Sequence, residues 1–273
     1  MEYRSVLPKK NHNVSHANPI KEFLTLFSAL VLLILLAYWS LGFFIDFAIE
    51  NISTETELEI IEISGVSREL INQNPGFNDL AKRLNDLLSD LNQCAGINYS
   101  TELFIDSSAS INALALPGGK IIVMQGLLNN IQSENGMAFV LAHELAHFKH
   151  RDHLRKMGRS AVLLALSIAA TGPNSKLSQI LTPVNILQSA KFSKDRETAA
   201  DSAALDFLYC YYSHVGGANE LFEFLDKDSK DRNFKMPHYF SSHPEAKKRI
   251  EMMQSFRLKR GYPIGLTKKL ILD

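Results

Sequence analysis

Hydrophobic positions along the chain form one long uninterrupted block, followed by several periodic segments. The block Phe23–Ile45 contains no charged residue. As a helix rising about 1.5 Å per residue it would span roughly 34 Å, enough to cross a hydrocarbon core of about 30 Å. A cleaved signal peptide usually has a shorter apolar core, of about 7–15 residues, and a small-residue cleavage site. We therefore predict an uncleaved transmembrane anchor.

The remaining segments have the mixed periodicity of an α+β fold that is mainly helical with a small β-sheet. Apolar residues at helical spacing predict helices, and short alternating runs bounded by turn residues predict strands. The predicted elements are a helix from Asn78 to about Gln93, a strand within 98–108, two strands within 112–124 joined by a turn at Pro117–Gly119, helical segments over 126–131, from the N-cap Ser133 onward and over 192–208, and a last helix beginning within 241–253.

A second apolar stretch covers residues 161–171 and ends at Gly172–Pro173. It is too short to span a bilayer as a helix, and segments of this length are more often buried or interfacial. The sequence leaves open whether it touches the membrane.

The balance of charge excludes one class of partner and orients the anchor. The formal net charge is zero, which gives no electrostatic reason to expect nucleic-acid binding. Lysine and arginine precede the apolar block, whereas the residues from Asp46 to Glu62 carry acidic side chains without a lysine or arginine. The positive-inside rule then places the N-terminus in the cytoplasm and the following domain on the far side, in the periplasm for a bacterial inner membrane.

Two cysteines, Cys94 and Cys210, do not form a metal-binding cluster. In an oxidising compartment they could pair, but their distance in space is unknown from the sequence. We interpret them as two unrelated buried thiols.

The segment Ala142–His150, "AHELAHFKH", contains the chemically most informative pattern. His143 and His147 lie one helical turn apart, so both imidazoles face the same way and can reach one Zn²⁺ at about 2.0–2.1 Å. Glu144 is offset by about 100° and can reach a water beside the metal without binding it. The neighbouring positions are apolar, and buried polar groups are costly unless they are paired or bind metal. By contrast, we interpret His150 and His153 as a solvated helix end.

A catalytic zinc site needs a third protein ligand, and the downstream segment "SKDRETAAD" offers two carboxylates. Glu197 and Asp201 are again four residues apart and share one helical face. Glu197 could complete a two-histidine, one-glutamate ligand set. Asp201 could accept the second ring N–H of a ligand histidine, for which we favour His143, although the sequence does not decide which.

Together these segments resemble a known family. "HELAH", "SKDRETAAD", "NALALPGGKIIVMQGLL" and "SSHPEAKKRI" are similar to ordered motifs of the HtpX/CaaX-prenyl-protease family of membrane-associated zinc metallopeptidases, which are gluzincins. The resemblance extends from about Leu80 to Ile250. One departure is Lys194, where the family usually has arginine, and this change keeps the charge.

The resemblance implies further expectations. It implies a zincin-type fold with one Zn²⁺ per chain, held by His143, His147 and Glu197, and a Pro-Gly-Gly hairpin beside the cleft. The edge strand Asn112–Ala115 (Asn112, Ala113, Leu114 and Ala115) could then pair with an extended substrate backbone. His243, in the late His-Pro loop, would lie near the metal and either stabilise the oxyanion or occupy the open zinc position in a resting state.

These expectations combine into one hypothesis, a membrane-anchored zinc endopeptidase acting on protein or peptide substrates in envelope protein quality control. The alternative is a chaperone-like or assembly factor whose zinc site is structural or held closed by His243. The predicted organisation is a cytoplasmic tail at 1–22, a transmembrane anchor at 23–47, a juxtamembrane spacer at 48–77 and a zinc metallopeptidase domain at 78–273.

Overall fold

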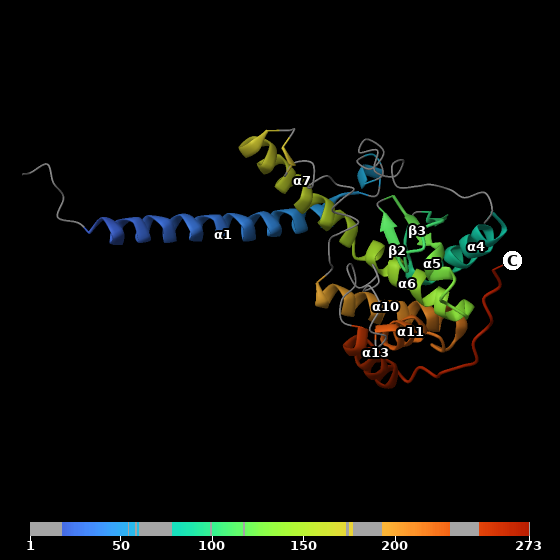
Figure 1. Cartoon of the computed structure of the whole chain (residues 1–273). Helices are drawn as coiled ribbons and strands as arrows, with labels where there is room; N and C mark the ends of the chain where they lie inside the picture. Colours follow the sequence, from blue (N-terminus) through green and yellow to red (C-terminus); the bar gives the residue numbers. More distant parts are fainter. Residues whose placement is uncertain are drawn as a thin grey trace, which may run out of the picture. The chain divides into compact units, whose positions relative to one another are not determined.

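The structure is a computed structural model that describes residues 18–53, 55–57, 59, 78–98, 100–116, 118–172, 175–176, 193–229 and 246–272. The chain divides into two units, Met1–Phe47 and Ala48–Asp273. The elements, shown in Figure 1, are helices α1 (Pro19–Asn51), α4 (Asn78–Ala95), α5 (Gln125–Leu128), α6 (Glu134–Lys149), α7 (Asp152–Thr171), α10 (Lys194–Tyr212), α11 (Glu220–Ser229) and α13 (Ala246–Arg260), and strands β1 (Glu102–Asp106), β2 (Ala113–Leu116) and β3 (Lys120–Met124).

The apolar block forms most of helix α1, which is 33 residues long. Among the described residues it is the one helix long and apolar enough to cross a membrane, judged by length and composition. Most of its large side chains from Ile20 to Phe47 are exposed, whereas Ile49 in its last turn is buried. A helix with apolar residues on every side has no polar face for water, as expected of a segment that lies in an apolar surrounding.

The second unit is the mainly helical domain with a small sheet that the sequence predicts. Its described strands have the order β1–β3–β2. Strand β1 is parallel to β3, with Glu102 opposite Lys120, and β2 is antiparallel to β3, with Ala113 opposite Val123. The parallel pair requires the chain to cross over between β1 and β3, and the short β2 lies within that crossover. Because β3 lies between β1 and β2, strand β2 is at an edge of this sheet.

Helix α6 lies at the centre of the second unit. It packs against α4, α10 and β2, and every residue from Asn135 to Phe148 is buried. In Figure 1 the sheet lies on one side of α6 and helices α10, α11 and α13 lie on the other. The predicted N-cap is confirmed, since the Ser133 hydroxyl accepts a hydrogen bond from the Gly136 N–H at 2.9 Å. Burial on all sides explains why α6 lacks an amphipathic pattern.

A disulfide joins Cys94 at the end of α4 to Cys210 near the end of α10. The interpretation of the two cysteines as unrelated buried thiols is therefore wrong. The sequence separation of 116 residues hides the proximity, which arises because α4 and α10 both pack on α6.

Candidate metal centre

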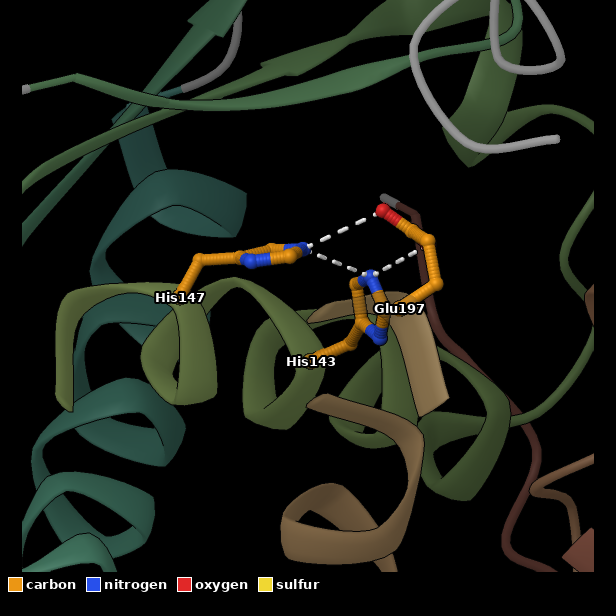
Figure 2. A group of neighbouring side chains, drawn as sticks. All are labelled: His143, His147 and Glu197. Carbon is orange, nitrogen blue, oxygen red and sulfur yellow. Dashed lines mark hydrogen bonds and ion pairs between the residues drawn. The ribbon is translucent and has the colours of Figure 1, made fainter. Parts of the chain in front are cut away.

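Helix α6 places two imidazoles on one buried face. The Nε2 atoms of His143 and His147 lie 3.1 Å apart, and both residues are fully buried. Figure 2 shows the two rings turned toward the same point above the helix. The arrangement follows from the spacing of four residues, which is close to one helical turn.

Helix α10 supplies a carboxylate to the same point. Glu197 Oε2 lies 3.5 Å from His143 Nε2, and Glu197 Oε1 lies 3.6 Å from His147 Nε2. Glu197 is in the first turn of α10, which begins after the N-cap Ser193, and it is 2% exposed. Two helices separated by more than forty residues thus converge on one buried position.

The three side chains match the requirements of a tetrahedral metal site. Their donor atoms all lie within 4.8 Å of one another. With bonds of about 2.0–2.1 Å, two ligands of a tetrahedral Zn²⁺ are about 3.3–3.4 Å apart. The observed separations of 3.1, 3.5 and 3.6 Å bracket this value. Two imidazoles and one carboxylate could therefore hold a divalent cation and leave a fourth position for solvent or substrate.

The second nitrogen of each ring has a buried carboxylate partner. His143 Nδ1 lies 3.0 Å from Asp201 Oδ1, which is the contact that the sequence-based hypothesis favours. His147 Nδ1 lies 2.9 Å from Asp152 Oδ2. Such partners fix the tautomer, so that Nδ1–H donates to the carboxylate and Nε2 offers its lone pair to a metal.

Sequence reasoning missed Asp152. We interpreted the residues around His150 and His153 as a solvated helix end, but Asp152 and His153 are 2% and 1% exposed. Both lie in the first turn of α7, which begins after a two-residue turn that follows α6. A carboxylate five residues after the second motif histidine was the available signal.

Arg249 of α13 is the second residue that sequence reasoning missed. Its Nε and Nη2 donate to the two oxygens of Asp201 at 2.8 and 2.6 Å, and its Nη1 lies 2.7 Å from Glu197 Oε2. One guanidinium therefore holds both α10 carboxylates, and a fork of this kind fixes their orientation. Arg249 belongs to the quoted segment "SSHPEAKKRI", in which we singled out only His243.

The neighbouring groups and burial shift the pKa values of the two histidines in opposite directions. Burial opposes a charge on His143, but hydrogen bonds to Asp201 and Glu197 outweigh it and raise the pKa of His143 to about 9. Burial lowers the pKa of His147 to about 4, since the hydrogen bond to Asp152 offsets it only in part. Burial would raise the pKa of Asp201, but the Arg249 guanidinium holds it below its ordinary value. A metal ion bound here would take the place of the proton on His143 Nε2.

Glu144 connects α6 to the edge strand. Its Oε2 accepts a hydrogen bond from the Ala115 N–H at 2.9 Å, and the residue is 1% exposed. The hypothesised base and the strand hypothesised to bind substrate are thus in direct contact. Asn112 precedes β2 by one residue, and its carbonyl accepts from the Met124 N–H at 3.1 Å. His243, the remaining predicted site residue, lies outside the described residues.

The fold and the site define the class of protein as a metallopeptidase built on a His-Glu-x-x-His helix and a downstream glutamate. The comparison with protein families agrees, because the model of Peptidase family M48 matches residues 78–257. The chain belongs to this family. The predicted resemblance to membrane-associated metallopeptidases is confirmed at this level.

Individual relatives give the same result. The chain is 31% identical over 158 residues to the mitochondrial metalloendopeptidase OMA1 of Schizosaccharomyces pombe, covering 57% of this chain and 46% of the relative. It is 31% identical over 160 residues to the metalloprotease YcaL of Escherichia coli, covering 57% of this chain and 60% of the relative. It is 32% identical over 117 residues to a putative beta-barrel assembly-enhancing protease of Vibrio cholerae, covering 41% of this chain and 24% of the relative. The match spans less than two thirds of the length of each of these relatives.

Proposed function

We propose that the chain is a zinc-dependent endopeptidase. The observation that supports this most directly is the convergence of His143, His147 and Glu197 on one buried position at separations suited to a tetrahedral ion. Two imidazoles and a carboxylate are a common ligand set for catalytic zinc, with one position left for solvent. When bound there, zinc would polarise the scissile carbonyl and make a water more acidic.

Glu144 is the proposed general base and acid. Its carboxylate takes a proton from water as the water oxygen forms a bond to the carbonyl carbon. When the carbon–nitrogen bond breaks, the same proton passes from Glu144 to the leaving amine. The Ala115 N–H that binds Glu144 Oε2 orients the carboxylate for this transfer.

Strand β2 is the proposed binding site for the substrate backbone. In an antiparallel pair, residues alternate between those bonded to the partner strand and those whose N–H and C=O point away. Because the Asn112 carbonyl accepts from Met124 in β3, Leu114 shares its orientation, and Ala113 and Ala115 direct their backbone groups to the open edge. The Ala113 N–H and C=O and the Ala115 C=O could then pair with an extended peptide.

For His243 we propose one of two roles in the catalytic site. It would either stabilise the developing oxyanion or close the fourth metal position in a resting state. The second alternative would make the enzyme latent until a trigger moves the late loop.

We further propose that α1 anchors the chain in a bacterial inner membrane, with the N-terminus in the cytoplasm and the peptidase domain in the periplasm. The lysines and arginine before the apolar block and the acidic residues after it support this orientation. The Cys94–Cys210 disulfide supports it independently, since such bonds persist in oxidising compartments. Removal of misfolded envelope proteins is the proposed task, and one relative is named as a protease that enhances β-barrel assembly.

The test is a comparison of the full-length, detergent-purified chain with the variant Glu144→Gln. Metal content is measured by mass spectrometry and proteolysis with a casein substrate. We expect about one zinc per chain in both proteins, and a loss of turnover of at least about 100-fold in the variant, because acid–base catalysis contributes about 10²–10⁴-fold. Removal of zinc with a chelator should abolish cleavage, and adding zinc back should restore it.

The matched control is Glu223→Gln on α11, which changes the same chemical group at an exposed position. This variant should cleave at the wild-type rate. A chain that binds zinc but never cleaves peptide, with or without Glu144, would instead favour the assembly factor with a structural metal.

A further inference from the structure

The turn between α6 and α7 contacts two different parts of the chain, the metal centre and the residues that follow the apolar block. Helix α6 ends at Lys149 and α7 begins at Asp152. Between them Arg151 adopts a left-handed backbone conformation with φ of 53°. This conformation costs a residue with a Cβ about 1–2 kcal/mol and persists where the surrounding contacts stabilise it. The turn therefore depends on what its side chains bind.

One direction leads to the metal centre. Asp152 Oδ2 lies 2.9 Å from His147 Nδ1, and Asp152 Oδ1 lies 3.1 Å from Arg196 Nη1. The orientation of the His147 ring thus depends on where the turn places Asp152.

The other direction leads to the residues that follow the apolar block, 49–53 and 55–57, which we call the junction segment. Arg151 Nη1 donates to the backbone carbonyls of Ile49 and Ile52, at 2.7 and 2.5 Å. The Ile49 carbonyl belongs to the last turn of α1, where carbonyls have no helical partner. The side chain of Arg151 supplies that partner.

A buried hydrogen bond adds a second link between the turn and the junction segment. His153 Nε2 lies 2.8 Å from Glu57 Oε1, and both side chains are 1% exposed. Glu57 is held in place by a short helical turn in which Ser53 Oγ accepts from the Thr56 N–H at 3.2 Å. Removing one partner would leave the other buried polar group without this contact, which costs free energy, so the contact links the two segments. The pair between Arg155 and Glu50 is exposed on the glutamate side and contributes little.

We propose that the junction segment positions Asp152, and through it His147, so that the affinity of the centre for its metal depends on how this segment is seated. Asp152 stands between Arg151 and His153, which are the two residues that bind the segment. Displacing the segment frees the turn that carries Asp152 and loosens the orientation of the His147 ring. Because the segment begins only four residues after the end of the apolar block, a change at the block could regulate the peptidase. This inference rests on the proposed metal site.

The experiment measures zinc affinity of the full-length chain in detergent by competition with a fluorescent chelator. Four proteins form a cycle, namely wild type, Glu57→Ala, Asp152→Asn and the double variant. Loss of a partner of a ligand histidine weakens metal binding about 10–100-fold. We therefore expect Asp152→Asn to weaken zinc binding about 10-fold or more and Glu57→Ala about 5-fold or more. In the Asp152→Asn background, Glu57→Ala should change the affinity less than about 2-fold.

Two further variants keep the result decisive. Glu55→Ala, an exposed carboxylate two residues away, should bind zinc as the wild type does. If Glu57→Ala does not fold, Glu57→Gln takes its place in the cycle, since the amide fills the same space but no longer accepts as strongly from His153. Wild-type affinity in the folded Glu57 variant, or equal weakening with and without Asp152, would overturn the inference. Absence of zinc binding by the wild type would instead overturn the proposed function.

Discussion

At the scale of single residues, the centre consists of two imidazoles whose outward nitrogens meet a shared position and whose inward nitrogens meet carboxylates. Asp201 holds His143 and Asp152 holds His147. Arg249 then holds Asp201 and Glu197 together. Buried carboxylates are costly without a compensating charge, and the guanidinium offsets the charge of the two α10 carboxylates.

The role of Asp201 is tested by the variant Asp201→Asn. An asparagine amide can no longer accept as strongly from the His143 Nδ1–H, so the ring loses its fixed tautomer. We expect zinc affinity to fall about 10–100-fold. Chelator competition measures it, and Asp206→Asn, a partly exposed aspartate on the same helix, is the control. Equal affinity in both variants would show that Asp201 does not orient His143.

At the scale of elements, α6 is held at both ends. Its N-terminus is capped by Ser133, whose backbone N–H donates to Glu220 at 3.1 Å, and its first residue, Glu134, accepts from the Tyr212 hydroxyl at 2.9 Å. The turn that follows its C-terminus is bound to the junction segment through Arg151. The two histidines therefore lie on a helix whose position is set by several other segments of the chain.

The contact between α10 and α6 gives a prediction for alkaline stability. Burial, with the hydrogen bond to the Glu134 carboxylate, raises the pKa of Tyr212 above its ordinary value. The folded state then keeps a proton that the unfolded state loses above about pH 10. This contribution to the free energy of unfolding is complete below pH 10 and is lost as the pH rises further.

The variant Tyr212→Phe should reduce the free energy of unfolding by about 1 kcal/mol at pH 8, as for a typical hydrogen bond. The difference from the wild type should shrink as the pH rises above 10. Urea unfolding of the detergent-purified chain, followed by circular dichroism at pH 8 and 11, measures both effects. Tyr209→Phe, on the same helix and 40% exposed, serves as the control. A difference that stays constant between the two pH values would contradict the assignment.

At the scale of the whole molecule, two features determine the environment that the chain needs, namely the Cys94–Cys210 disulfide and the apolar helix α1. The disulfide closes a loop of more than a hundred residues that includes the sheet, α6 and α7. In the chain-entropy account, long closed loops restrict the unfolded state most.

Replacing both Cys94 and Cys210 by alanine should lower the free energy of unfolding by about 2–5 kcal/mol. Denaturant titration of the oxidised protein with and without reductant gives the same comparison on the native sequence, so the two results should agree. Free thiols in the denatured, unreduced wild type would show that the bond does not form.

The proposed membrane orientation predicts the activity of a fusion. Alkaline phosphatase attached after Asp273 needs an oxidising compartment, so it should be active in intact bacterial cells if the peptidase domain is periplasmic. A β-galactosidase fusion at the same point should be inactive. The opposite pattern would place the domain in the cytoplasm.

The amino-acid sequence by itself determined the features that depend on neighbouring residues. The spacing of His143 and His147 places both rings on one face because one helical turn is local geometry. Ser133 caps α6, and the uncharged block forms one long helix, for the same reason. Order and composition of these motifs also sufficed to identify the family.

Only the tertiary structure decided which distant groups meet. Cys94 meets Cys210, and Arg249 meets Glu197 and Asp201, because separate helices pack around α6. His153 looks like a surface residue in sequence, yet it is buried against Glu57. Such contacts depend on the packing of elements far apart in the chain, and no local pattern encodes that packing.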